Sequence, residues 1–297
     1  MFRSRAFQPR PSSAPSFSPH RPLFVGWLPA LGLVALLLGG CATASGNGRV
    51  RIPAGPFPMG TATVDEMMEA TNYGLPEPWY VDEHPLHEVR LPTFWIDRTE
   101  VTNRDYQKFI NAHPEVHAPD DWSRRQYAPG KDEYPVVYVT WYHADFYCRW
   151  RGGRLPSEAE WEKAARGSGG RVYPWGDEFR PELANLSVGP FDAGRAHAVG
   201  TTPGGASPYG VLDMIGNVWE WVADDYAPYP GADPEAAENF GKGHKVVRGL
   251  SYEPLGHFPG PDYRRVLEVT ARASFRGYDP PNARLRDVGF RCAGSSR

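Results

Sequence analysis

The stretch Val211-Leu-Asp-Met-Ile-Gly-Asn-Val-Trp-Glu-Trp221 sets two acids around a glycine, between large apolar residues. A glycine between Asp213 and Glu220 favours a turn over a continuous helix that would align the two side chains. A loop that folds back would bring both carboxylates and nearby backbone carbonyls together, and calcium prefers oxygen ligands of this kind. The alternative is a tryptophan-rich core strand, in which Asp213 caps the turn and Glu220 is solvated.

Further short motifs surround this stretch in a definite order. They are Pro58-Met-Gly60, Glu100-Val-Thr-Asn103, Gly153-Arg-Leu-Pro-Ser-Glu-Ala-Glu-Trp161, Tyr173-Pro-Trp-Gly176, Val247-Arg-Gly249 and Val288-Gly-Phe-Arg-Cys292. Together with Gly216-Asn-Val-Trp-Glu-Trp221 they resemble the signature of the formylglycine-generating enzyme (sulfatase-modifying factor) family, from roughly Ile52 to Ala293. The resemblance implies a single irregular α+β domain, distantly like a C-type lectin, with twisted antiparallel strands, two packed helices and long loops.

The composition agrees with a loop-rich domain. The 297 residues are 41% apolar and 13% aromatic, with 32 Gly and 31 Pro, which is enough for one large domain or two small ones. Three Cys exclude a disulfide-dense scaffold and a multi-cysteine zinc site. Beyond the first 40 residues, 28 basic side chains stand against 35 acidic ones, which argues against nucleic acid and anionic lipid as partners.

The N-terminus has the pattern of an export signal. Four arginines and no acids precede and flank an apolar run at 23–38, which ends in Leu38-Gly-Gly-Cys41. This ending resembles a bacterial lipobox, so we expect a signal peptide at 1–40, a lipidated Cys41 with a tether at 41–49, and the folded domain at 50–297. Ala42 after the cysteine indicates the outer membrane. The alternative is an uncleaved anchor, but the run is shorter than the ~20 residues of a membrane span.

Several helices and strands can be predicted from local patterns. Alternating apolar residues indicate a strand at 87–96, and a β-branched run indicates a buried strand at 134–140. Thr102 is a good N-cap for a helix that places Tyr106, Phe109 and Ile110 on its buried face. We also expect a helix at 141–150, and another that begins at Ser157 and ends at a glycine, Gly167.

The family resemblance assigns two calcium sites. One takes a side chain, two carbonyls and a carboxylate, and these fall on Asp213, Gly216, Val218 and Glu220. The other takes an Asn, the adjacent carbonyl and a later Asp, which points to Asn185, Leu186 and Asp192. Asp192 comes earlier than the family pattern requires, because the intervening loop is shorter in this chain.

The chemistry of the family's oxidases requires a pair of cysteines that bind copper(I), a soft metal that prefers thiolate. The second of these cysteines falls on Glu268, and no Cys lies between positions 149 and 291. Copper and formylglycine formation are therefore not expected. Instead, His257, Arg264, Glu268 and Arg272 could line a polar groove for a carboxylate or charged peptide. The alternative is a solvated loop with weak surface ion pairs.

The two remaining cysteines are Cys148 and Cys292. In an exported protein they form an even pair in an oxidising compartment, and the family joins the cysteines at these positions. Two free buried thiols are the alternative. The sequence thus favours a lipid-anchored, calcium-stabilised module that binds or assembles with a protein, peptide or glycan. The competing hypothesis is an enzyme of the same superfamily, which includes non-haem-iron oxidoreductases, with an unknown reaction at the Glu268 and His257 groove.

Overall fold

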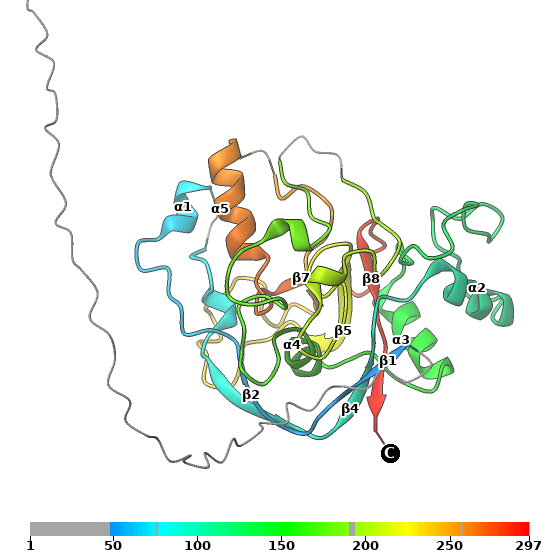
Figure 1. The fold of residues 1–297 in the computed structure, drawn as a ribbon, viewed down its shortest axis with the longest axis horizontal. Coiled ribbons are helices and arrows are strands. Elements are labelled where there is room, and N and C mark those ends of the chain that lie inside the picture. Colours follow the sequence, from blue (N-terminus) through cyan, green and yellow to red (C-terminus); the bar gives the residue numbers. More distant parts are fainter. Residues whose placement is uncertain (1–47, 75–76, 190–193, 257, 297) are drawn as a thin grey trace, which may run out of the picture. The chain divides into compact units, whose positions relative to one another are not determined.

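A computed structural model describes residues 48–74, 77–189, 194–256 and 258–296. The predicted signal peptide, Cys41, Asp192 and His257 lie outside the described residues. Short strands, five α-helices and long irregular connections alternate along this part of the chain (Figure 1). The strands are β1 (Arg49–Ile52), β2 (Gly55–Met59), β3 (His87–Leu91), β4 (Phe94–Asp97), β5 (Trp219–Asp225), β6 (Lys245–Arg248), β7 (Gly277–Asp279), β8 (Val288–Phe290) and β9 (Ala293–Ser295). The α-helices are α1 (Glu69–Asn72), α2 (Asn103–Ala112), α3 (Trp141–Trp150), α4 (Glu158–Arg166) and α5 (Gly260–Thr270), and the short 3-10 helices are η1 (Val81–Glu83), η2 (Pro181–Leu183) and η3 (Pro203–Gly205).

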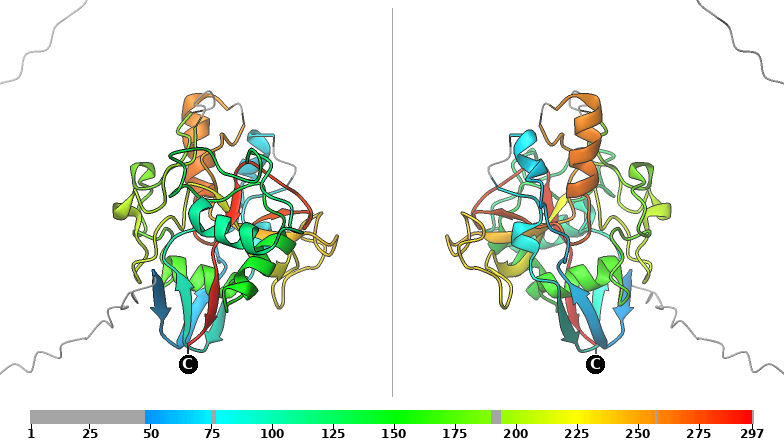
Figure 2. Two further views of the ribbon diagram at one scale, coloured as in Figure 1. Left: turned by 90° about the vertical axis from the view of Figure 1, so that its right-hand side faces the viewer. Right: turned by 90° about the vertical axis from the view of Figure 1, so that its left-hand side faces the viewer.

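The strands form three small sheets. Strands β1, β4 and β9 are antiparallel neighbours in that order, and β2 pairs with β3. The third sheet has the order β7-β6-β5-β8, in which β5 and β8 are parallel. Figure 2 shows α5 and the β1-β4-β9 sheet at opposite ends of the described domain. The α+β class is confirmed.

The strand predicted at 87–96 is two strands. Pro92 separates β3 from β4, and the two belong to different sheets. Proline has no N–H to donate to a ladder, so a strand that contains it is interrupted at that point. The alternating apolar residues do lie in strands, but the sequence pattern did not predict the interruption at Pro92.

The prediction of a strand at 134–140 is wrong. This segment is extended but irregular, and its N–H groups bond separate partners: that of Val136 reaches the Val101 carbonyl, and that of Tyr138 reaches the Leu285 carbonyl. Pro135 and a positive φ of 58° at Tyr138 prevent a regular ladder. The β-branched residues are buried here for tertiary reasons, with Val136 and Val139 in the core.

The three long predicted helices begin where their caps indicate. The side chains of Thr102, Thr140 and Ser157 accept backbone N–H groups at the starts of α2, α3 and α4, and Ser157 with Glu160 completes a capping box. The apolar stripe of α2 is fully buried against α3 in an aromatic cluster. Trp161 and two alanines of α4 enter the neighbouring core. None of the described helices is long and apolar enough to cross a membrane.

The segment expected to form a polar groove contains a helix. In α5 the side chains of Tyr263, Val266 and Leu267 are buried, so the helix packs firmly on the domain. Proline and glycine at the start of this helix are typical of turns and loops, so the sequence did not predict a helix here.

Candidate functional site: a buried acid cluster and a closed cysteine pair

The stretch at 211–221 is a loop that leads into β5. Three of its residues adopt positive φ, namely Asp213 at 53°, Gly216 at 82° and Asn217 at 62°. A Cβ at Gly216 would lie 2.6 Å from the carbonyl oxygen of Asn185, so this turn needs glycine for space as well as for conformation. The predicted turn at the glycine is therefore present, and it presses the loop against the segment at 185.

Glu220 is at the centre of the domain, not in solvent. Its side chain is fully buried, and Arg291 donates to it through Nε and Nη2, each at 2.6 Å. The indole N–H of Trp161 donates to the same carboxylate at 2.9 Å. Burial raises the pKa of Glu220 and the Arg291 charge opposes that rise. The alternative in which Glu220 is solvated is wrong.

Arg291 uses its remaining donors on backbone carbonyls. It reaches the carbonyl oxygens of Asp97, Leu212 and Asp213, at 3.2, 2.9 and 3.2 Å. One guanidinium thus connects the loop, β4, β5 and the last strands of the chain. Such a buried, fully bonded pair fixes geometry, and removing one partner would leave an uncompensated charge.

A third acid, Glu100, is buried beside this pair. It is 2% exposed; its Oε1 accepts a hydrogen bond from Asn217 Nδ2 at 2.9 Å, while its Oε2 has no hydrogen-bond partner. Burial raises its pKa well above the usual value, and the nearby charges of Asp213 and Glu220 add to the rise. The sequence places Glu100 only in the motif Glu100-Val-Thr-Asn103, and Asp97, Arg98, Arg104 and Asp105 flank it, so no local pattern distinguishes it as buried.

The predicted calcium ligands are brought together only in part. Asp213 Oδ2 accepts the N–H of Gly200 at 2.6 Å, and Glu220 has both oxygens bonded to Arg291. Asn185 donates from Nδ2 to the Asn217 side chain at 3.1 Å. Among the described residues, no three Asp, Glu, His or Cys side chains are arranged to hold a metal ion. Backbone carbonyls would have to supply much of any coordination shell.

The residues expected to line a polar groove are on α5 and just after it, in different surroundings. Arg272 is buried in an ion pair with Glu83, which differs from the open position expected for it. Arg264 lies 5.4 Å from the centroid of the Phe179 ring, and the carboxylate of Glu268 lies 3.5 Å from Arg265. Of the three groove residues that the structure describes, Arg264 is exposed and Glu268 is partly exposed.

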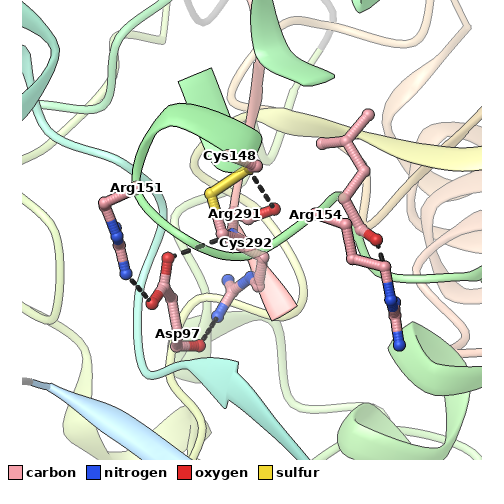
Figure 3. The surroundings of a disulfide bond; sticks show 7 residues. Asp97, Cys148, Arg151, Arg154, Arg291 and Cys292 are labelled. Carbon is pink, nitrogen blue, oxygen red and sulfur yellow. Dashed lines mark hydrogen bonds and ion pairs between the residues drawn. A yellow bond between two sulfur atoms is a disulfide. The ribbon is translucent and has the colours of Figure 1, made fainter. Parts of the chain in front are cut away.

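Cys148 and Cys292 form a disulfide (Figure 3). Their Cα atoms are 5.5 Å apart, and both residues are fully buried. Asp97 accepts the N–H of Cys292 at 3.0 Å and pairs with Arg151, so charged groups bracket the bridge. The alternative of two free thiols is not what the structure shows. Every cysteine in the described residues is consequently oxidised.

A cavity lined by polar and aromatic side chains lies beside the turn that follows β6. It has a volume of about 300 Å³ and lies beside Tyr252, the last residue of Arg248-Gly-Leu-Ser-Tyr252. Its lining includes four tyrosines and three cations: Tyr127, Tyr134, Tyr138, Tyr252, Lys131, Arg195 and Arg286. The Lys131 ammonium lies 3.6 Å from the centroid of the Tyr134 ring, and Arg286 pairs with Glu253 at 2.6 Å. Among the residues that the structure describes, no cysteine lines this cavity.

An irregular α+β domain with a buried Trp-Glu-Trp acid is typical of the class of sulfatase-modifying-factor folds. The model of the sulfatase-modifying factor enzyme 1-like domain matches residues 37–296, and the chain belongs to this family. It is 33% identical to the mouse inactive C-alpha-formylglycine-generating enzyme 2, over 83% of this chain and 85% of that one. It is also 33% identical to the formylglycine-generating enzyme of Streptomyces coelicolor, over 84% and 90% of the two chains.

Two further similarities extend the range of the family. Hercynine oxygenase of Mycolicibacterium smegmatis is 33% identical over 82% of this chain, which spans 60% of that protein. The structure of PvdO from Pseudomonas aeruginosa superposes with a TM-score of 0.60 at 28% identity, over 82% of this chain and 93% of PvdO. These relatives confirm the fold predicted from the motifs.

Proposed function

We propose that this protein is an exported, lipid-anchored binding or assembly module of the family, stabilised by calcium and without copper-thiolate oxidase activity. The observation that carries the proposal is the state of its cysteines. Cys148 and Cys292 are joined, and the sequence offers no other cysteine beyond position 41. Copper(I) needs thiolate ligands, and a disulfide sulfur cannot supply them.

The buried charges support calcium at the loop. Glu100, Asp213 and Glu220 interact electrostatically with one another, and Arg291 is the cation that opposes them. Three carboxylates thus face one cation, and the buried Oε2 of Glu100 has no hydrogen-bond partner. A divalent cation with oxygen ligands would compensate both. Asp213, the carbonyls of Gly216 and Val218, and Glu100 would hold the ion, whereas Glu220 is committed to Arg291. The ion would brace the loop and supply no catalytic chemistry.

The proposal includes a second calcium site at Asn185, Leu186 and Asp192. Asn185 directs its amide to Asn217 and to the Arg195 carbonyl, and its own carbonyl accepts the N–H of Asn217. These bonds connect the segment to the first loop, so an ion at one site would stabilise the other.

The tyrosine-lined cavity suits a peptide or glycan ligand that carries an anionic group. Tyrosine rings offer flat apolar contact together with hydroxyl donors, and Lys131 and Arg286 can bind a carboxylate. The groove proposed at Arg264 and Glu268, with His257, would be a second contact surface on α5.

Two measurements test the proposed function. Metal analysis of the purified protein should find calcium and neither copper nor iron at stoichiometric level. A peptide with the Cys-x-Pro-x-Arg pattern, incubated with copper-loaded protein, should give no aldehyde by mass spectrometry, while the Streptomyces coelicolor relative serves as positive control. Turnover at a rate comparable to that control would overturn the proposal.

The second candidate is an enzyme, and the similarity to a formylglycine-generating enzyme and to hercynine oxygenase favours it. Such an activity would use the polar residues of α5 or of the tyrosine-lined cavity. Stoichiometric iron in the purified protein would favour this candidate. Anchoring at the outer membrane has its own test, because Cys41→Ser should abolish incorporation of labelled fatty acid and release the protein from membranes.

A further inference from the structure

Helix α3 exposes a row of aromatic side chains. Tyr142, Phe146 and Trp150 are 57%, 39% and 42% exposed, and they recur every four residues, so they lie on one face of the helix. The opposite face is buried and carries Cys148 of the disulfide. The other large apolar side chains that are exposed in the described residues lie in loops or on β7. We call Tyr142, Phe146 and Trp150 the aromatic row.

The row is held rigidly. Phe146 packs edge-on against Phe109 of α2, with ring centroids 5.1 Å apart, and Trp150 lies 5.6 Å from the same ring. The disulfide fixes the buried side of α3 to the C-terminal segment. An exposed, preorganised aromatic surface of this kind usually marks an interaction site, because leaving it in water forgoes the free energy of burial.

The path of the chain indicates what covers the row. Gly48, the first described residue, and Trp150 line the same cavity, which has a volume of about 610 Å³. Cys41 precedes Gly48 by seven residues, and an extended chain of that length spans at most about 25 Å. Since α3 has ten residues and a helix of that length measures about 15 Å, the whole row lies within reach of a bilayer that holds a lipid on Cys41.

The charges around the row favour a neutral lipid surface. Arg149, the exposed cation of α3, is paired with Asp145 at 2.9 Å, so the helix presents almost no net charge beside the rings. Beyond the first 40 residues the chain carries more acids than bases, which opposes attraction to anionic lipid. Trp and Tyr, in contrast, partition to the headgroup region of bilayers through their amphipathic rings.

We propose that Tyr142, Phe146 and Trp150 dock on the headgroup region of a zwitterionic lipid surface and set the orientation of the domain on the membrane. The inference rests on the proposed lipid anchor at Cys41, because the short tether brings the row to the bilayer. The lipid attaches the chain at one point only, and a second contact through the row would fix how the domain is oriented on the membrane. Figure 1 shows α3 and α5 on different sides of the domain, so α5 would not contact a membrane on which α3 docks.

The test uses the full-length lipoprotein in phosphatidylethanolamine–phosphatidylcholine vesicles that contain brominated lipid. Bromine quenches tryptophan fluorescence only at short range, so a docked Trp150 should dominate the quenching. Trp150→Phe should lose most of the bromine-dependent quenching and still float with the vesicles. The matched control is Trp175→Phe, at a ring that stacks on Tyr173 near α5, and it should change the quenching little.

The outcomes separate the row from the anchor. Flotation with equal quenching in wild type and Trp150→Phe would overturn the docking surface and leave the anchor intact. Failure of the full-length protein to float would overturn the anchor and the docking surface with it. A second variant, Tyr142→Glu, keeps the fold because its side chain is exposed, and it should reduce the quenching of Trp150. If Tyr142→Glu instead dissociates an oligomer in detergent, a protein covers the row and the lipid assignment is wrong.

Discussion

Removal of the Cys148–Cys292 bridge should be among the most destabilising changes available in this domain. The bridge joins residues 144 positions apart, and closing so long a loop in the unfolded chain lowers its entropy by an amount worth about 5 kcal/mol at 25 °C. Cys148→Ala/Cys292→Ala should therefore lose up to about 5 kcal/mol of unfolding free energy. For a domain of this size the loss corresponds to a melting temperature lower by roughly 10–20 °C.

The assay is thermal unfolding by calorimetry and circular dichroism, with protein exported to an oxidising compartment. Wild type should show an intact mass lower by two hydrogens than the reduced protein. Without reductant neither Cys148 nor Cys292 should alkylate even after unfolding, because the disulfide leaves no thiol. Cys41→Ser is the matched control, because it removes the remaining cysteine and should leave the melting temperature unchanged. Equal melting temperatures for wild type and the double variant would refute the loop-closure reasoning, and two alkylated thiols in native wild type would refute the bridge.

Three further predictions concern the buried acids and the turn. Arg291→Leu should cost about 3–5 kcal/mol in chemical denaturation because it leaves Glu220 buried without its cation, whereas Arg291→Leu combined with Glu220→Leu should recover much of the loss. Burial raises the pKa of Glu100. Ionisation of this carboxyl therefore lowers the stability fully above the raised pKa, and the loss decreases as the pH falls from there towards the ordinary carboxyl pKa, below which it is absent. In the presence of chelator, Glu100→Gln should be more stable than wild type at alkaline pH, by roughly 1–3 kcal/mol, and about as stable as wild type in acid. Added calcium should stabilise the wild type more than it stabilises Glu100→Gln. Gly216→Ala should destabilise by at least about 2 kcal/mol more than Gly241→Ala, because both glycines have positive φ but only Gly216 faces a close backbone oxygen; equal losses would contradict the steric argument.

Local patterns predicted the elements whose signals are local. The caps at Thr102 and Ser157 and the apolar spacing of Tyr106, Phe109 and Ile110 identified α2 and α4, because capping and periodicity act within one turn of a helix. The segment at 134–140 failed for the opposite reason. Its β-branched residues fit both a strand and a buried irregular segment, and only distant partners such as Val101 and Leu285 decide between them.

The sequence predicted several residues of the candidate site, but it did not predict which hydrogen bonds and ion pairs they make. The motif at 211–221 pointed to a turn with two acids, and the structure contains that turn. That Arg291 occupies both oxygens of Glu220 could not be deduced, because the two residues are 71 positions apart and no local rule connects them. The burial of Glu100 was hidden for the same reason, since its neighbours Asp213 and Asn217 come from a much later part of the chain.

The placement of residues 288–295 has a consequence for biogenesis. This one segment supplies β8 beside β5, Arg291 to Glu220, Cys292 to Cys148 and β9 beside β4. If the chain is exported as proposed, it crosses the membrane from its N-terminus, and Trp221 and Phe94 stay uncovered until this segment emerges. Contacts of such long sequence separation also form slowly. We expect the translocated intermediate to depend on periplasmic chaperones, and chains truncated before position 288 to be degraded after export instead of accumulating as partly folded protein.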